Sequence, residues 1–160
     1  MQKKNLITAK TYDELIAKAR QIENEEMPAV AREIDEARKH GDLRENAQYA
    51  AAKEKQRMID SKLNEINQAL TSHIVFDPST QKFDTVCFGS KVIIKFLDDN
   101  TTKTFTILSD FDSNISLGIM SINAPIIQAI LGFGVGDASE ITLAGKVREI
   151  EIEKIEQAIL

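Results

Sequence analysis

Two carboxylates in residues 39–46, which read KHGDLREN, have a spacing that could support chemistry. Asp42 and Glu45 are three residues apart, so on a helix they would share one face. Paired carboxylates supply the oxygen ligands that hard cations such as Mg²⁺ prefer. The same pattern fits a helix start, with Asp42 as the cap and Glu45 placed favourably in the first turn. The spacing alone leaves both interpretations open, and the cap is the commoner use of such a pair.

A long helical hairpin is predicted to carry these residues at its tip. From Tyr12 to about Leu70 the sequence is rich in helix-forming residues, with Gly41 as its only glycine and Pro28 as its only proline. Apolar residues recur every three or four positions on both sides of Gly41, as in an antiparallel coiled-coil seam. Because proline lacks an N–H group, we expect a kink or break near Met27. The first stripe is Leu15, Ala19, Ile22, Met27, Val30, Ile34 and Ala37, and the second is Ala47, Ala51, Met58, Ile59, Leu63, Ile66 and Leu70.

The second half of the chain changes to strand-like periodicity. Five segments alternate or cluster β-branched and aromatic residues, and DDNTT at 98–102 marks a hairpin turn. Asn123, with proline two residues later and Gly132 beyond, predicts a short capped helix. We therefore predict an α+β chain: an N-terminal antiparallel α-helical coiled-coil hairpin over 1–76, then an antiparallel β-sheet domain with one short helix over 77–160. The strand-like segments are 85–99, 103–109, 115–122, 139–144 and 147–155.

Composition limits the classes of function. Residues 1–76 hold 13 basic and 13 acidic residues, whereas residues 77–160 hold 7 and 12, so the whole net charge of −5 lies in the second half. An acidic surface there argues against binding a phosphate backbone. The sequence has no apolar run long enough to cross a membrane and no secretory signal. Cys87, the single cysteine, has no internal disulfide partner and is expected in the core, so we expect a cytoplasmic protein.

Several long motifs resemble one family of proteins. EARKHGDLRENAQYAAAKEKQ at 36–56 resembles the hairpin tip of bacterial transcript-cleavage factors of the GreA/GreB type, more closely GreA. FGSKVII at 88–94, SINAPIIQAILGFGVGD at 121–137 and VREIEIEKI at 147–155 resemble the second domain of that family, which is FKBP-like. The resemblance covers essentially the whole chain, and it reverses the preference for a simple cap at Asp42 and Glu45.

The resemblance implies a transcription elongation factor that acts on RNA polymerase. The hairpin of such factors enters the secondary channel of a backtracked polymerase, which holds the extruded 3′ end of the nascent RNA. The polymerase then hydrolyses its own transcript, so the factor stimulates the reaction and is not itself the enzyme. We expect a monomer with no membrane association.

The resemblance also assigns roles to tip residues. Asp42 and Glu45 match the two functional acids that complete a second Mg²⁺ site in the polymerase active centre. Two-metal hydrolysis uses one ion to activate water and another to stabilise the leaving oxygen. Two carboxylates alone would hold Mg²⁺ poorly, so we expect no cofactor on the isolated chain. Arg38 and Lys53 match positions that contact RNA, although their spacing alone fits a solvated helix face. Residues that match supports of the tip are Gly41, Leu43, Asn46 and Tyr49.

In the second domain, the resemblance implies docking onto a coiled coil of the largest polymerase subunit, at the channel rim. At least one of the two isoleucines in the predicted docking segment is expected in the core. Ala124 and Phe133 depart from the family, which commonly has serine and lysine there. The predicted docking residues are Ser121, Asn123, Pro125, Ile126 and Ile127.

Three other functions compete with this one. A Gre-like inhibitor would occupy the channel without promoting cleavage, but such relatives have altered acidic tips. A prolyl isomerase would need an aromatic-lined pocket, yet residues 77–160 contain no Trp and no Tyr. A generic hairpin adaptor is compatible with the seam, but it would not need this tip motif.

Overall fold

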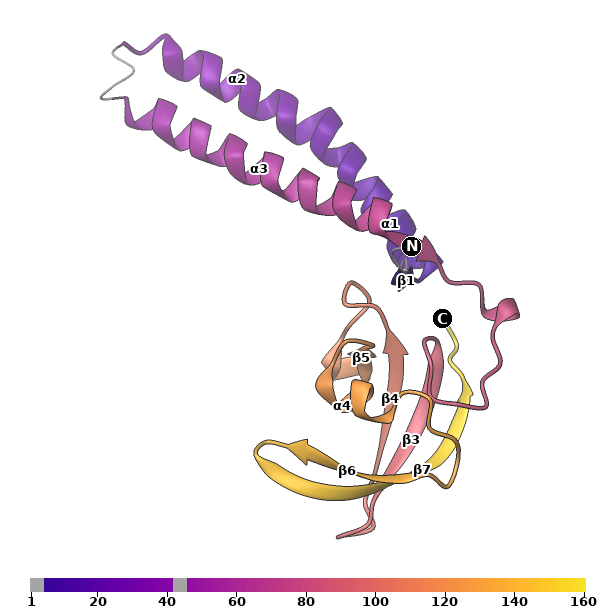
Figure 1. Cartoon of the computed structure of the whole chain (residues 1–160). Coiled ribbons are helices and arrows are strands. Elements are labelled where there is room, and N and C mark those ends of the chain that lie inside the picture. The colour runs from indigo at the N-terminus through magenta and orange to yellow at the C-terminus, as the bar shows by residue number, and fades with distance from the viewer. Residues whose placement is uncertain (1–4, 42–45) are drawn as a thin grey trace. The chain divides into compact units, whose positions relative to one another are not determined.

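The computed structural model describes residues 5–41 and 46–160, which form two compact units (Figure 1). One unit runs from Tyr12 to His73 and contains the helices of the hairpin. The other comprises 74–160 together with the described residues 5–11 at the start of the chain. The predicted α+β organisation is confirmed. Among the described residues, no helix is long and apolar enough to span a membrane.

The first arm of the hairpin is one helical run with a π-helical turn inside it. Helix α1 spans Ala9–Gln21, the π-helical turn η1 spans Ile22–Glu26, and α2 spans Met27–Arg38. The Met27 N–H bonds to the carbonyl of Ile22, five residues earlier, which adds one residue to the turn. The predicted stripe steps by five between these two residues, so the π turn keeps Met27 on the side of the seam. The irregularity expected at Met27 is therefore a wider turn just before Pro28.

Helix α3, Ala47–Ser72, forms the second arm, and its seam differs in part from the predicted stripe. Ala47 and Ala51 are exposed, and Met58 is 66% exposed. The heptad that contains Ile59, Leu63, Ile66 and Leu70 continues backwards through Gln56, Ala52 and Tyr49. These three residues are buried or half-buried, so the predicted stripe was wrong N-terminal to Ile59. The seam near the tip consists of small or polar side chains, whereas the far end packs Ala19, Ile22, Val30, Ile59 and Ile66 in one cluster.

The second unit contains a five-stranded sheet in the order β5-β4-β3-β7-β6. Its strands are β3 (Ser90–Phe96), β4 (Thr102–Leu108), β5 (Ile119–Ser121), β6 (Ala138–Leu143) and β7 (Lys146–Gln157). The sheet is mixed, because β5 runs parallel to β4 while the other pairs are antiparallel. This corrects the all-antiparallel prediction: the chain crosses back after β4 through the short turn η3 (Ile115–Leu117) before it enters β5.

A separate two-stranded sheet pairs β1 (Asn5–Ile7) with β2 (His73–Val75). The segment from β2 to β3 contains the short turn η2 (Pro78–Thr80) and then Cys87. Cys87 is half-buried and precedes β3, so it is not the core strand residue that the sequence predicted. Its burial raises the pKa of the thiol.

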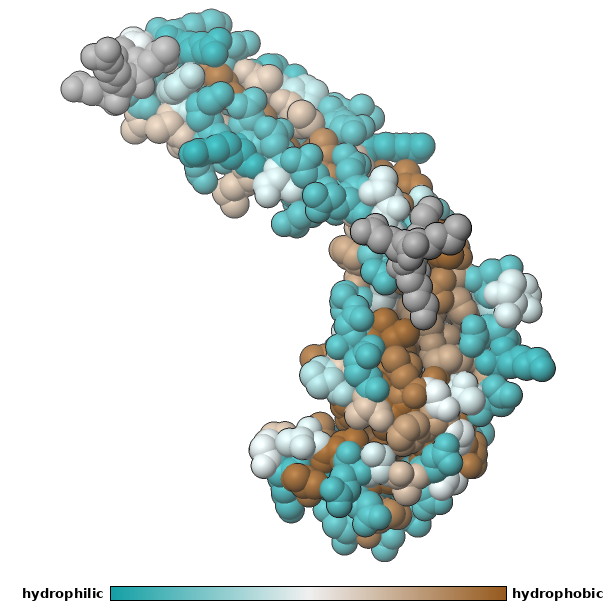
Figure 2. Space-filling view, in the orientation of Figure 1, coloured by the Kyte–Doolittle hydropathy of each residue, from teal (hydrophilic) through white to brown (hydrophobic). Residues whose placement is uncertain are grey.

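The core of the second unit lies between one face of the sheet and helix α4 (Pro125–Ile130). Val92, Ile94 and Phe96 alternate along β3 and are fully buried, as expected for a strand with one covered face. Ile127 and Ile130 of α4 pack against them. Figure 2 shows a mainly hydrophilic outside for the hairpin and larger hydrophobic areas on the second unit. Most of the apolar packing therefore belongs to the second unit.

Candidate functional site

The described part of the hairpin tip ends at Gly41 and resumes at Asn46. Helix α2 ends at Arg38, and Lys39, His40 and Gly41 are exposed. The predicted acids Asp42 and Glu45, and the predicted support Leu43, lie outside the described residues. Gly41 has φ +115°, and a Cβ there would meet nothing within 4 Å. Glycine is thus favoured by the left-handed backbone and not by crowding.

Asn46 connects the two arms directly behind the tip. Its Oδ1 accepts a hydrogen bond of 3.0 Å from the Tyr49 N–H, which caps the start of α3. Its Nδ2 donates to the Ala37 carbonyl near the end of α2, at 2.5 Å. One side chain therefore satisfies a free N–H of one helix and a late carbonyl of the other. This arrangement links the end of α2 to the start of α3.

The Tyr49 ring packs against the Arg38 side chain. The Arg38 guanidinium carbon lies 6.0 Å from the centre of the Tyr49 ring, within the range of a cation–π contact. Arg38 also lies 3.9 Å from the Asp35 carboxylate, with 56% of its side chain exposed. Tyr49 itself is half-buried in the seam. The structure thus gives Tyr49 a packing position and leaves much of the Arg38 side chain accessible.

The other basic groups near the tip make weak surface pairs. Lys53 is half-buried and donates to Gln56 Oε1 at 3.0 Å. Lys39 lies 3.1 Å from the Glu36 carboxylate, and both side chains are 69% exposed. Surface ion pairs of this kind contribute about 0–1 kcal/mol, so these contacts can be exchanged for a phosphate. Arg38 and Lys53 come from different arms, on either side of the tip.

The described residues contain no group of three or more His, Cys, Asp or Glu side chains that could hold a metal ion. A Mg²⁺ ion needs six oxygen ligands in near-octahedral geometry. Asp42 and Glu45 are suitable donors in chemistry but too few in number, so a partner would have to supply the other ligands.

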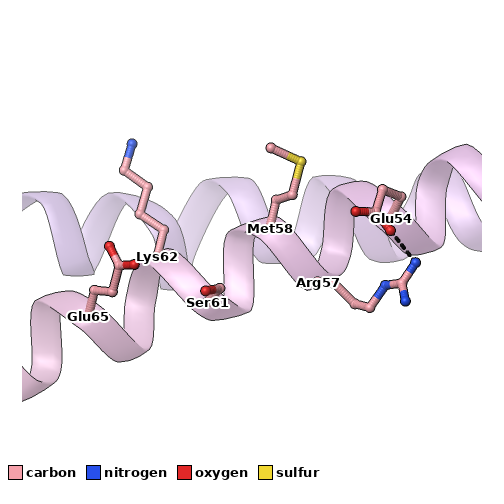
Figure 3. A pocket seen from close by; sticks show the side chains of 6 residues that line it. All are labelled: Glu54, Arg57, Met58, Ser61, Lys62 and Glu65. Carbon is pink, nitrogen blue, oxygen red and sulfur yellow. Dashed lines mark hydrogen bonds and ion pairs between the residues drawn. The ribbon is translucent and has the colours of Figure 1, made fainter.

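A shallow hollow on the outer surface of α3 offers no alternative reaction site. Figure 3 shows its six lining side chains along one surface of the helix, with an ion pair between Arg57 and Glu54. The lining alternates charges around the exposed Met58, as solvated helix faces commonly do. Its residues are Glu54, Arg57, Met58, Ser61, Lys62 and Glu65.

The second predicted functional segment lies between β5 and α4. Ser121 ends β5, Asn123 is exposed, and Pro125 begins α4. The cap position of α4 is Ala124, which has no side chain to accept a hydrogen bond. The prediction of Asn123 as the cap was therefore wrong by one residue, because Pro125 is the first helical residue and the cap directly precedes it.

The two isoleucines of this segment have different environments. Ile127 is fully buried in the core, whereas Ile126 is half-buried at its edge. Direct docking by Ile127, as predicted, is therefore corrected to a packing role, and Ile126 keeps an accessible surface. The expectation that at least one isoleucine belongs to the core agrees with this burial.

Sequence reasoning missed Asp110, which holds this segment. Asp110 accepts hydrogen bonds from the Ser121 hydroxyl and from Asn123 Nδ2, the latter at 2.9 Å. The serine and asparagine at 121 and 123 can both donate hydrogen bonds, but their residue types do not identify the acceptor. Nothing in their local spacing indicates an aspartate 11 to 13 residues earlier.

The shifted pKa values of Asp98 and Asp99 arise from contacts that hold the fold together. Hydrogen bonds from Arg148 lower the pKa of Asp98, and bonds from Thr101 lower the pKa of Asp99. The Arg148 guanidinium carbon lies 4.0 Å from the centre of the Phe96 ring. Its Nε and Nη2 donate to Asp98 at 3.0 and 2.8 Å, and Nη2 also donates to Asp99 at 3.0 Å. This cluster ties the β3–β4 turn to β7.

Known proteins match this chain over nearly its whole length. A family model described as "Transcription elongation factor, N-terminal" matches residues 5–75, and one described as "Transcription elongation factor, GreA/GreB, C-term" matches residues 80–157. The transcription elongation factor GreA of Helicobacter hepaticus is 39% identical over 144 residues, covering 90% of this chain and 88% of that protein. That of Nautilia profundicola is 37% identical over 152 residues, covering 95% and 94%.

Among solved structures, GreA factor homologue 1 of Thermus thermophilus aligns over 96% of this chain and 99% of its own. Its sequence identity is 17% and its TM-score is 0.44. The assignment to a family rests on the sequence matches alone.

Proposed function

Since this chain belongs to the GreA/GreB family of transcription elongation factors, we propose that it binds RNA polymerase and stimulates the polymerase's own cleavage of backtracked nascent RNA. One observation carries the proposal: in the sequence, KHGDLREN connects α2 to α3, and Asn46 at its end bonds to both helices. The hairpin would enter the secondary channel of the polymerase, in the cytoplasm, and the factor would act as a monomer.

In this proposal the tip acids act inside the polymerase. Asp42 and Glu45 would supply carboxylate ligands to a shared Mg²⁺, with the other ligands coming from the polymerase and the RNA. Such an ion supplies charge stabilisation and activates water during phosphodiester hydrolysis. The chain's own residues position the carboxylates and add positive charge beside the RNA phosphates. The factor therefore contributes to a reaction whose catalyst is the polymerase.

Arg38 and Lys53 would contact the extruded RNA. Their support is charge and position, since they come from the two arms on either side of the tip. The Arg38 side chain is 56% exposed beside Asp35, and Lys53 is half-buried and donates to Gln56. Arg38 is partly oriented by its contact with the Tyr49 ring. Replacing each with Glu should weaken crosslinking of the extruded 3′ end, and unchanged crosslinking would remove the RNA-contact role.

The second unit would dock on the coiled coil of the largest polymerase subunit, at the rim of the secondary channel. Ser121, Asn123, Pro125 and the accessible edge of Ile126 would form the contact. The segment's exposure supports this role, as does the concentration of hydrophobic surface on this unit in Figure 2.

The test is to add purified protein to stalled, backtracked elongation complexes with Mg²⁺ and measure release of the RNA 3′ fragment. Wild type should release it, while Asp42→Asn and Glu45→Gln should bind the polymerase normally and release little. Asp60→Asn, a change of an exposed acid elsewhere on the hairpin, serves as the matched control. Binding by wild type without any release would instead indicate a channel-occupying inhibitor. Normal release by both tip variants would refute the role of the acids.

A further inference from the structure

We propose that Asp110 is a positioning residue for polymerase docking: its carboxylate holds Ser121 and Asn123 in the orientation that the partner contacts. This inference rests on the proposed docking role of the second unit and adds a residue to it. Asp110 lies after β4, outside the predicted docking segment, and no family motif singled it out.

The contacts form a closed network on the surface. One oxygen of Asp110 accepts from the Ser121 hydroxyl, and the other accepts from Asn123 Nδ2 at 2.9 Å. Ser121 Oγ in turn accepts from the Asn123 backbone N–H at 3.0 Å. The side chains of Asp110 and Ser121 each bond to both other residues, and Asn123 bonds to Asp110 through its side chain and to Ser121 through its backbone N–H. Bonds to an ionised carboxylate are stronger than neutral ones, which favours this single arrangement.

Other contacts hold the backbone of the docking segment, but not the side chains of Ser121 and Asn123. Strand β5 is three residues long and pairs with β4, Leu108 being opposite Ser121, and its Ile119 also forms a bridge with Asn114. Helix α4 has six residues and lacks a side-chain cap. Backbone bonds join Ile122 to Leu108 and Ala124 to Ser121, whereas the half-buried side chain at 121 and the exposed one at 123 bond within the network with Asp110.

Asp110 is itself held in a closed turn. The Asp112 N–H bonds to the Ser109 carbonyl at 3.1 Å, and the Ser109 hydroxyl donates to Asp112 Oδ2 at 2.5 Å. Ser109 is 2% exposed, so the turn is anchored in the interior. Asp110 therefore extends from a fixed turn and holds the side chains of Ser121 and Asn123.

The test uses Asp110→Ala, Asp110→Asn, Asn123→Asp and the exchange Asp110→Asn/Asn123→Asp. In Asp110→Asn the amide can still accept from Ser121, but its NH₂ group meets the NH₂ group of Asn123. In the exchange, the new amide at 110 can donate to the new carboxylate at 123, so the bond is restored with its direction reversed. Asp84→Asn is the matched control, since Asp84 is an exposed aspartate of the same unit away from this network.

Two quantities separate positioning from chemistry: the factor concentration that gives half-maximal cleavage, and the cleavage rate at saturating factor. Asp110→Ala should raise the concentration for half-maximal cleavage about tenfold, because two side chains must then be ordered on binding. The cleavage rate at saturating factor should stay unchanged. Asp110→Asn should give a smaller increase. Asn123→Asp changes a proposed contact residue as well, so the exchange should bind more tightly than Asn123→Asp alone, because only the exchange restores the bond to residue 110. Equilibrium binding to polymerase should follow the same order.

Wild-type affinity for Asp110→Ala would overturn the proposal. So would an exchange whose loss of affinity equals the sum of the losses in Asp110→Asn and Asn123→Asp, because the two side chains would then act independently. If Asp110→Ala does not fold, Asp110→Asn and the exchange still decide. A wild-type protein that does not bind polymerase would refute the docking proposal, which is a different result from any of these.

Discussion

Thr8 Oγ1 donates a hydrogen bond of 2.6 Å to Asp112 Oδ1, across 104 positions of the sequence. The same hydroxyl accepts a bond of 3.3 Å from the Thr11 N–H and so caps the first turn of α1. Asp112 also binds Ser109, next to Asp110. The carboxylate thus joins the first described residues of the chain to the turn that carries Asp110, and both belong to the second unit.

Replacing Asp112 with Asn should make the second unit less stable at neutral pH. Burial raises the pKa of this carboxyl, but hydrogen bonds from Ser109, Thr11 and Thr8 outweigh it and leave the pKa lowered. A lowered pKa contributes stability above the unfolded value, near pH 4, and this contribution is lost as pH falls through the folded value. The variant should lose about 1–2 kcal/mol at pH 7 and less below pH 3.

The measurement is urea unfolding of both proteins from pH 2.5 to 7. Because other acids also titrate, the informative quantity is the difference between wild type and variant at each pH. Hydrogen exchange at the Ser109 amide, which donates to Asp112, reports locally. An equal difference at every pH would contradict the assigned ionisation.

Local patterns in the sequence were sufficient for the hairpin, the strands of the five-stranded sheet and the short helix, but not for β1 and β2. The five-residue step from Ile22 to Met27 also contained the π turn, since one extra residue must be absorbed to keep the seam aligned. The face of α3 that lines the seam was harder to predict. Alanines at 47, 50, 51 and 52 lie on several faces of the helix and do not indicate which face is buried. Because Gln56 is a polar residue in the seam, the apolar pattern did not show the heptad that runs through it.

Contacts between distant segments could not be predicted in the same way. The parallel pairing of β5 with β4 depends on a crossover, and a strand's period does not specify its neighbour. Arg148 reaches aspartates 49 and 50 positions away, and Asp110 holds Asn123 across 13. At the candidate site the residue types could be identified from the sequence. The two hydrogen bonds by which Asn46 joins the arms could be identified only from the structure.

Gly89 should not tolerate any side chain. Its φ is +81°, and an added Cβ would lie 2.5 Å from two ring atoms of Phe76. Phe76 is buried against Phe88, so the ring has little room to move. Gly89→Ala should lower the unfolding free energy of the second unit by about 2–4 kcal/mol, combining left-handed strain with overpacking.

Gly132→Ala is the matched control for this change. Gly132 has a similar φ of +83°, but a Cβ there would meet nothing within 4 Å. It should therefore show only the backbone strain, about 1–2 kcal/mol. Denaturant unfolding checks both, and equal losses for the two variants would exclude the contact with Phe76 as a cause.

Ala124→Ser should stabilise the second unit. Ala124 is the cap of α4, in an extended conformation with φ −61° and ψ 138°, which suits a capping serine. The new hydroxyl could accept from the N–H of Ile126 or Ile127, adding about 1 kcal/mol. Ala124→Val, which adds atoms without an acceptor, should give no gain. Thermal unfolding of the three proteins tests this, and equal melting temperatures for Ser and Val would contradict capping.

Asn46→Asp should separate the two functions of this side chain at the hairpin tip. The carboxylate can still accept from the Tyr49 N–H and remains favourable at the start of α3. It cannot donate to the Ala37 carbonyl, and it places a negative charge against that oxygen. Helix content should therefore stay near wild type, while the end of α2 loosens. Asn46→Ala should lose both bonds and about 1–2 kcal/mol.

Circular dichroism and hydrogen exchange at Lys39 and His40 distinguish these effects, because both amides bond to the last turn of α2. In Asn46→Asp, these amides should exchange faster while those inside α3 do not. If the tip acts in transcript cleavage, the same variant should also lower the cleavage rate at saturating factor, with its binding to polymerase unchanged. Wild-type exchange at Lys39 and His40 would show that the bond to Ala37 does not hold the arms together, and the tip would then depend on the seam alone.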